Sequence, residues 1–199
     1  MGNANIIGIN GGKHKYGAET VTALPVPIIK LRDCANISLK NLIRSLFDSA
    51  DDAFFEMADK AGSNGDQSMY FDAMRELRLQ KKKIAVNLIQ TINASFNTIE
   101  ESSYKNQTSN NGAPDVLSLI QNDELELNVA KDSMISRLNN SAKSQLDDLH
   151  ARVESVLSFS FTESLTPAGP EVLCNSFVTA CEILDVPLKA RLVIFKLFE

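Results

Sequence analysis

The sequence predicts an all-α fold, an elongated helical bundle with long antiparallel helices and two short C-terminal helices. Apolar residues recur at spacings of three and four over three long stretches, which is the pattern of amphipathic helices. These stretches cover roughly 38–61, 68–99 and 123–157. Two proline-containing breaks near the C-terminus then predict the short helices.

The chain divides into three predicted segments. Five of the nine glycines precede residue 18, and the apolar residues there have no helical period, so residues 1–30 are predicted to be a flexible leader. Pro25 and Pro27 predict that the end of this leader is an extended segment. Residues 31–160 are predicted to form the bundle of long helices, and residues 161–199 the short C-terminal helices.

The first two helices should form an antiparallel hairpin. The first begins at Ser38, and Gly62–Gly65 supplies its stop. Asp66 or Ser68 can cap the second helix, and the loop between the two helices has only a few residues. The apolar line of the first helix includes Phe47 and Phe54, and that of the second includes Met74 and Leu77.

A third long helix is expected over 123–157, matched in length to the second. The polar stretch 101–114 connects them, so they should lie side by side and antiparallel, extending past the shorter first helix. Between them, the short apolar run 116–120 is equally compatible with a brief strand or a turn.

The last helix is predicted to be an interaction surface. Pro170 and Pro187 mark the first turns of two short helices, of which the first buries Leu173, Phe177, Cys181 and Leu184. The second is apolar nearly all round and reaches Glu199 without a cap, so we expect the natural chain to continue. The predicted binding partner of this helix is the remainder of the full-length chain, another protein, or a second copy in a homodimer. The candidate interaction residues are Leu192, Ile194, Phe195, Leu197 and Phe198.

Composition excludes several classes of function. A net charge of −5 and a pI near 5.1 argue against nucleic acid or an anionic membrane as partner. Three cysteines do not make a disulfide framework and fit a reducing compartment. No secretory signal or long apolar span is recognisable, so a cytoplasmic location is expected.

Two charged clusters invite a functional interpretation. Asp48, Asp52 and Glu56 lie four apart on one helical face, but the only histidines are His14 and His150, so a solvated acidic face is favoured over a metal site. A basic patch in the second helix could bind RNA or phosphate, although pairing with the acidic face of the first helix is favoured. The patch comprises Arg75, Arg78, Lys81, Lys82 and Lys83.

The chain offers no convincing catalytic group. Cys34, Cys174 and Cys181 have no neighbouring histidine, and the last two lie seven apart on one face, as core residues do. His150 is expected to be a hydrogen-bonding residue at the surface or between helices. We therefore expect a protein that is not an enzyme and needs no cofactor or metal.

Four strings in order resemble a known family. They are LFDSADDA (46–53), YFDAMRELR (70–78), NDELE (122–126) and VPLKARLVIFKLFE (186–199). Over residues 30–199 the chain resembles the N-terminal part of the bacterial domain-of-unknown-function family 1631. Some members carry a thymidine phosphorylase label, which the residues here do not support, since no glycine-rich phosphate loop follows a strand.

The resemblance implies a place at the N-terminus of a much longer bacterial protein. Together with the helical pattern, it leads us to expect a non-catalytic interaction or scaffold module of a regulatory protein. One alternative is part of a cyclic-dinucleotide signalling protein whose ligand domain lies downstream. Another is a fragment of a metal- or nucleotide-dependent enzyme.

Overall fold

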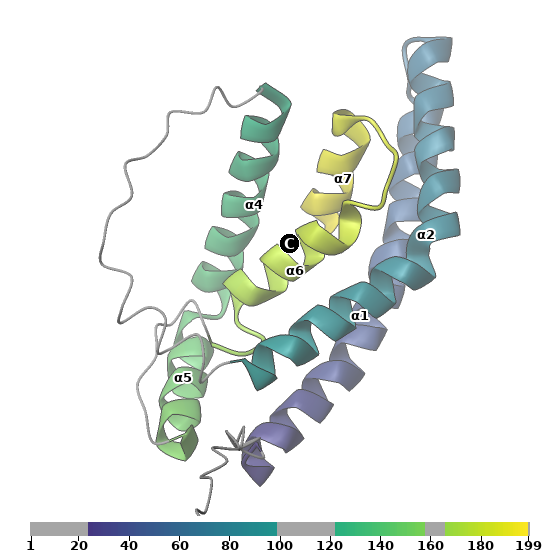
Figure 1. The fold of residues 1–199 in the computed structure, drawn as a ribbon. Helices are drawn as coiled ribbons and strands as arrows, with labels where there is room; N and C mark the ends of the chain where they lie inside the picture. Colours follow the sequence, from purple (N-terminus) through teal and green to yellow (C-terminus); the bar gives the residue numbers. More distant parts are fainter. Residues whose placement is uncertain (1–23, 99–121, 158–165, 199) are drawn as a thin grey trace, which may run out of the picture.

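The described part of the chain consists of helices joined by turns. The computed structural model describes residues 24–98, 122–157 and 166–198 (Figure 1). No strand occurs in these three ranges, so the predicted all-α fold is confirmed. The predicted leader up to residue 23 and the apolar run 116–120 lie outside the described residues. The helices are α1 (Val26–Asp59), α2 (Asn64–Asn97), α4 (Asn122–Ser141), α5 (Lys143–Leu157), α6 (Pro170–Cys181) and α7 (Leu188–Phe198).

Helices α1 and α2 pack along each other as the predicted antiparallel hairpin (Figure 1). The turn between them is fixed by Ser63, whose Oγ accepts a hydrogen bond from the Asp66 backbone N–H at 3.1 Å. Ser63 is therefore the N-cap of α2, in place of the predicted Asp66 or Ser68. Phe54 in α1 is fully buried and lies beside Tyr70 in α2, with ring centroids 6.4 Å apart. The paired apolar lines thus form the hairpin core.

Helix α1 begins twelve residues before the predicted Ser38, so the prediction of an extended segment at 24–29 was wrong. The Pro25 carbonyl accepts hydrogen bonds from the amides of Ile28 and Ile29, at 2.9 and 3.1 Å. Proline is tolerated here because the first helical N–H groups have no intrahelical partner. Burial of Ile28 ties this turn to the core. As a result α1 and α2 both have 34 residues, and α1 is not the shorter helix.

The third long helix is broken in two, which corrects the prediction of one helix over 123–157. The break follows Ser141, whose Oγ donates to the Leu138 carbonyl at 3.1 Å. Asn and Ser side chains near a helix compete with its backbone hydrogen bonds, and Asn139, Asn140 and Ser141 are consecutive here. Before the break, α4 packs on α6 and α7, whereas α5, after the break, turns toward α1. The expected side-by-side packing of α2 on this helix is replaced by packing of α2 on α6.

The C-terminal helices fill the space between the hairpin and α4. Helix α6 lies across α2, and α7 lies between α4 and α1 (Figure 1). Their starts near Pro170 and Pro187 match the prediction, because the Pro187 carbonyl accepts from the amides of Ala190 and Arg191. Phe177, Cys181 and Leu184 are buried as expected, and Leu173 is half-buried.

A buried turn precedes α6. The Gly169 amide donates to the Thr166 carbonyl at 2.8 Å, and Ala168 adopts a left-handed backbone with φ of 58°. A Cβ on residue 169 would lie 2.9 Å from the Thr166 oxygen, so this close approach requires glycine. The turn brings Thr166 against α5 and so joins the α5 and α6 parts of the fold.

Candidate interaction surfaces

One side of α2 carries exposed apolar side chains interleaved with basic ones. We call this set the α2 strip. Leu79 and Val86 are 65% and 51% exposed, and they lie seven residues apart, hence on one side of the helix. The opposite side contains the buried Leu77, Ile84 and Leu88. The α2 strip consists of Phe71, Arg75, Leu79, Lys82 and Val86.

Most cations of the predicted basic patch point to solvent. Arg78 is the exception, because its Nε lies 3.0 Å from both carboxylate oxygens of Asp51 in α1. The other four are exposed and form no ion pair with a described residue. Pairing across the hairpin, favoured from the sequence, therefore accounts for one of the five cations. The four are Arg75, Lys81, Lys82 and Lys83.

An aromatic pair extends the α2 strip onto α1. The ring of Phe55, itself 60% exposed, meets Phe71 edge to face with centroids 6.4 Å apart. Phe54, its neighbour in sequence, is instead fully buried. The solvent side of the hairpin thus presents a continuous apolar path from α1 to α2.

The C-terminal helix α7 is largely part of the core. Ile194 and Phe195, two of the candidate interaction residues, are buried and pack within this chain. Phe198 stacks on Phe177 of α6, and Leu197 is half-buried. The physical reason is that α1, α4 and α6 surround α7, so most of its apolar circumference is covered within the chain. Of the five predicted residues, Leu192 and Phe195 line an open groove, although Phe195 itself is buried.

That groove runs between α4 and α7. It has a volume of about 470 Å³ and is lined mainly by apolar atoms of both helices. Leu125 and Val129 of α4 form its outer rim and are 51% and 61% exposed. Leu192 and Phe195 of α7 line it from the other side. A hollow with exposed apolar residues at its rim is a surface on which another helix can dock.

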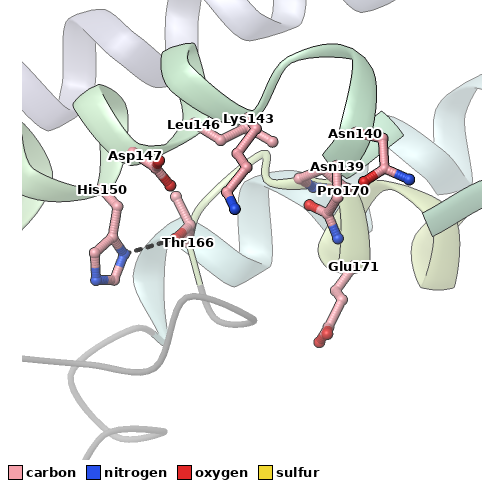
Figure 2. A pocket seen from close by; sticks show the side chains of 9 residues that line it. All are labelled: Asn139, Asn140, Lys143, Leu146, Asp147, His150, Thr166, Pro170 and Glu171. Carbon is pink, nitrogen blue, oxygen red and sulfur yellow. Dashed lines mark hydrogen bonds between the residues drawn. The ribbon is translucent and has the colours of Figure 1, made fainter. Parts of the chain in front are cut away.

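A second, polar cleft of about 290 Å³ lies at the junction of α4, α5 and α6 (Figure 2). Lys143 points into it from the start of α5, with Asp147 nearby on the same helix and Glu171 across it on α6. His150 Nδ1 lies 2.9 Å from the Thr166 hydroxyl, and His150 Nε2 lies 3.4 Å from a carboxylate oxygen of Glu154. His150 therefore joins two segments by hydrogen bonding, in the way expected from the sequence. Because both positive and negative side chains line this cleft, its charge does not indicate a particular class of ligand.

The cysteine and acidic side chains that were considered as catalytic or metal-binding groups do not come together in one site. Within 24–98, 122–157 and 166–198, no cluster of His, Cys, Asp and Glu side chains is arranged to hold a metal ion. Cys174 and Cys181 are buried, and desolvation raises the pKa of the Cys181 thiol to about 12, while Cys34 is exposed on α1. The acidic residues Asp48 and Asp52 are exposed on the outer side of α1. None of the described helices is long and apolar enough to cross a membrane.

The described fold is a helical domain that presents apolar surfaces to solvent. The chain belongs to the family described as protein of unknown function (DUF1631), N-terminal domain, whose sequence model matches residues 23–199. This match confirms the resemblance found in the four sequence strings. Searches of curated proteins and of solved structures found no match to the chain.

Sequence reasoning missed the exposed apolar residues of α2 and α4. Leu79, Val86, Leu125 and Val129 fall outside the main apolar line of their helices and were left unassigned. The available signal was a second, shorter line at spacings of three and four on the polar side. Single exposed apolar residues are ordinary, however, so the structure was needed to show that each pair lies on the solvent-facing side of its own helix.

Proposed function

We propose that this domain is a non-catalytic helical protein-interaction module of a larger bacterial regulatory protein. The observation that carries the proposal is the α2 strip, where Leu79 and Val86 face solvent although the other side of α2 is buried. Exposed apolar area costs roughly 25 cal/mol per Å², so apolar residues repeated along one solvent-facing side of a helix favour a binding surface.

The charges of the α2 strip indicate the kind of partner. Arg75 and Lys82 flank Leu79 on the same side of α2, and neither forms an ion pair with a described residue. Exposed cations around an apolar centre match a partner that has apolar anchors and a carboxylate rim. Nucleic acid is a poorer match, because Leu79 and Val86 would stay uncovered on a phosphate backbone and the net charge of the chain is −5.

A comparative pull-down tests this function. The 199-residue chain, a Leu79→Glu variant and a Leu42→Glu control serve as baits in bacterial extract, and bound proteins are identified by mass spectrometry. Leu42 is a suitable control because it is 64% exposed on α1 and outside the α2 strip. We expect a protein that binds the wild type and the control but not Leu79→Glu. Identical binding to all three baits, with equal helix content by circular dichroism, would refute the α2 strip as the binding surface.

A further inference from the structure

Helix α4 has an exposed line of residues with the same spacing as the α2 strip. On α4 the exposed Leu125 and Val129 are followed, three residues later, by the exposed Asp132. On α2, Arg75 and Leu79 are followed, three residues later, by Lys82. Alternating steps of four and three are the repeat by which two helices pack along each other in a coiled coil. We call Leu125, Val129 and Asp132 the α4 face.

The exposed charged side chains on the first part of α4 are opposite in sign to those of the α2 strip. Asp123, Glu124, Glu126 and Asp132 are all exposed on the first part of α4, and none of them forms an ion pair with a described residue. Carboxylates in the first turn also favour the helix dipole, which accounts for Asp123 and Glu124 but not for Asp132, more than two turns along. Basic side chains around Leu79 and acidic ones around Val129 are therefore electrostatically complementary.

We propose that the α2 strip of one copy of this chain docks on the α4 face of a second copy, with the two helices parallel. Leu79 then packs against Val129, and Lys82 lies opposite Asp132, since each charged residue follows its apolar neighbour by three positions. Arg75 lies beside Leu125, between the carboxylates of Glu124 and Glu126. The inference rests on the proposed function and names the partner as a second copy.

The fold requires that this contact joins two molecules. Helices α2 and α4 lie on opposite sides of the described fold, with α6 and α7 between them, so one copy cannot bring its own surfaces together (Figure 1). Pairing of two α2 strips would oppose cations, and pairing of two α4 faces would oppose carboxylates, so the mixed contact is selected. Such a head-to-tail contact leaves one free surface at each end and extends into a ring or an open chain.

The groove beside α4 adds area to the contact. Leu125 and Val129 form its rim, and Leu192 lines its wall, so a helix laid on the α4 face also covers part of α7. A single helix-to-helix contact of this kind remains below the roughly 1,200 Å² of a standard interface, so the association is weak and salt-dependent.

Sedimentation equilibrium of the 199-residue chain tests the proposal. We expect the average mass of the wild type to rise with concentration between roughly 10 µM and 1 mM, the range of weak contacts, and to fall when salt is added. Lys82→Glu places a carboxylate against Asp132, and Asp132→Lys places two cations together, so each variant alone should remain monomeric. An equimolar mixture of the two variants should recover association, because each contact between the two different variants pairs opposite charges.

Two controls give the experiment its specificity. Lys40→Glu and Asp148→Lys make the same charge changes at exposed positions outside both surfaces and should associate as the wild type does. A monomeric wild type throughout the range, or association unaffected by the two test variants, would overturn the proposal. Loss of association without recovery in the mixture would overturn it too. The interaction function is tested separately by the Leu79→Glu pull-down, which can succeed with an acidic helix of another protein while self-association fails.

Discussion

The ring of Phe177 in α6 lies parallel to the ring of Phe198 in α7, with centroids 3.9 Å apart and an interplanar angle of 8°. Phe195 approaches the same ring from another side at 6.0 Å. These contacts turn an apolar C-terminal helix into part of the core. They leave the α4 and α7 groove, together with the α2 strip, as apolar surfaces open to solvent.

The aromatic stack predicts a measurable coupling between α6 and α7. Phe177→Ala should lower the free energy of unfolding by about 3 to 5 kcal/mol, because this side chain is almost fully buried. Phe198→Ala should have a smaller effect, because Phe198 is only half-buried. Urea unfolding of both variants and the double variant should give a coupling of about 0.5 to 1.5 kcal/mol. Additive effects would show that the rings do not stabilise each other.

Two adjacent phenylalanines in α1 should respond differently to truncation. Phe54 is fully buried against α2, so Phe54→Ala should cost about 3 to 5 kcal/mol of stability. Phe55 is mainly exposed, so Phe55→Ala should cost less than about 1 kcal/mol. Denaturant midpoints of the two variants check this assignment, and equal losses would contradict the orientation of α1.

Gly169 should tolerate no side chain. Gly169→Ala places a Cβ 2.9 Å from the Thr166 carbonyl oxygen in a buried turn, so it should destabilise the fold by about 1 to 3 kcal/mol. Gly62→Ala is the matched control, since a Cβ there meets no atom within 4 Å. Thermal unfolding of both variants is the measurement, and a Gly169→Ala variant as stable as the control would refute the tight turn.

Asp66, in the first turn of α2, should make the free energy of unfolding depend on pH at acidic pH. A hydrogen bond from the Ser63 hydroxyl, together with the Lys189 ammonium 3.2 Å away, holds the pKa of Asp66 below its ordinary value near 3.8. The folded-state pKa is thus lower than the unfolded one, so the ionised carboxylate stabilises the fold above about pH 4. This contribution is lost as the pH falls through the folded-state pKa.

Comparison of wild type with Asp66→Asn measures this effect. The stability difference should be constant between about pH 5 and 7 and should shrink below about pH 4. Asp148→Asn is a suitable control, because Asp148 is also exposed but has no hydrogen bond or ion pair with a described residue. A difference between wild type and Asp66→Asn that persists at pH 2 would show that the effect is not electrostatic.

Thiol reactivity should separate the three cysteines. Cys34 is exposed, whereas Cys174 and Cys181 are buried and the pKa of Cys181 is raised to about 12 by desolvation. A thiol reagent at about pH 8 should therefore modify one cysteine rapidly in the folded chain and all three in denaturant. Cys34→Ser should abolish the rapid phase. Rapid modification that survives this substitution would contradict the packing of α6.

The sequence by itself determined the helical class, the hairpin and the positions of the C-terminal helices. Helix periodicity and turn residues are local properties of the sequence. The apolar periodicity that includes Phe54 and Leu77, and the helix starts at Pro170 and Pro187, could therefore be predicted without knowing the tertiary contacts. The family could be recognised for a similar reason, because three of the four strings lie within single helices and the fourth includes all of α7.

The tertiary structure decided what each helix packs against. Whether Pro25 opens a helix depends on the burial of Ile28, and the different neighbours of α4 and α5 on the two sides of the break are set by the packing. The same holds for the surfaces, since Phe195 and Leu79 are both apolar helix residues, yet one is enclosed by α6 and the other faces solvent. The hydrophobic effect is non-directional. The sequence therefore specifies which residues are apolar, and only the packed fold specifies which of them are buried.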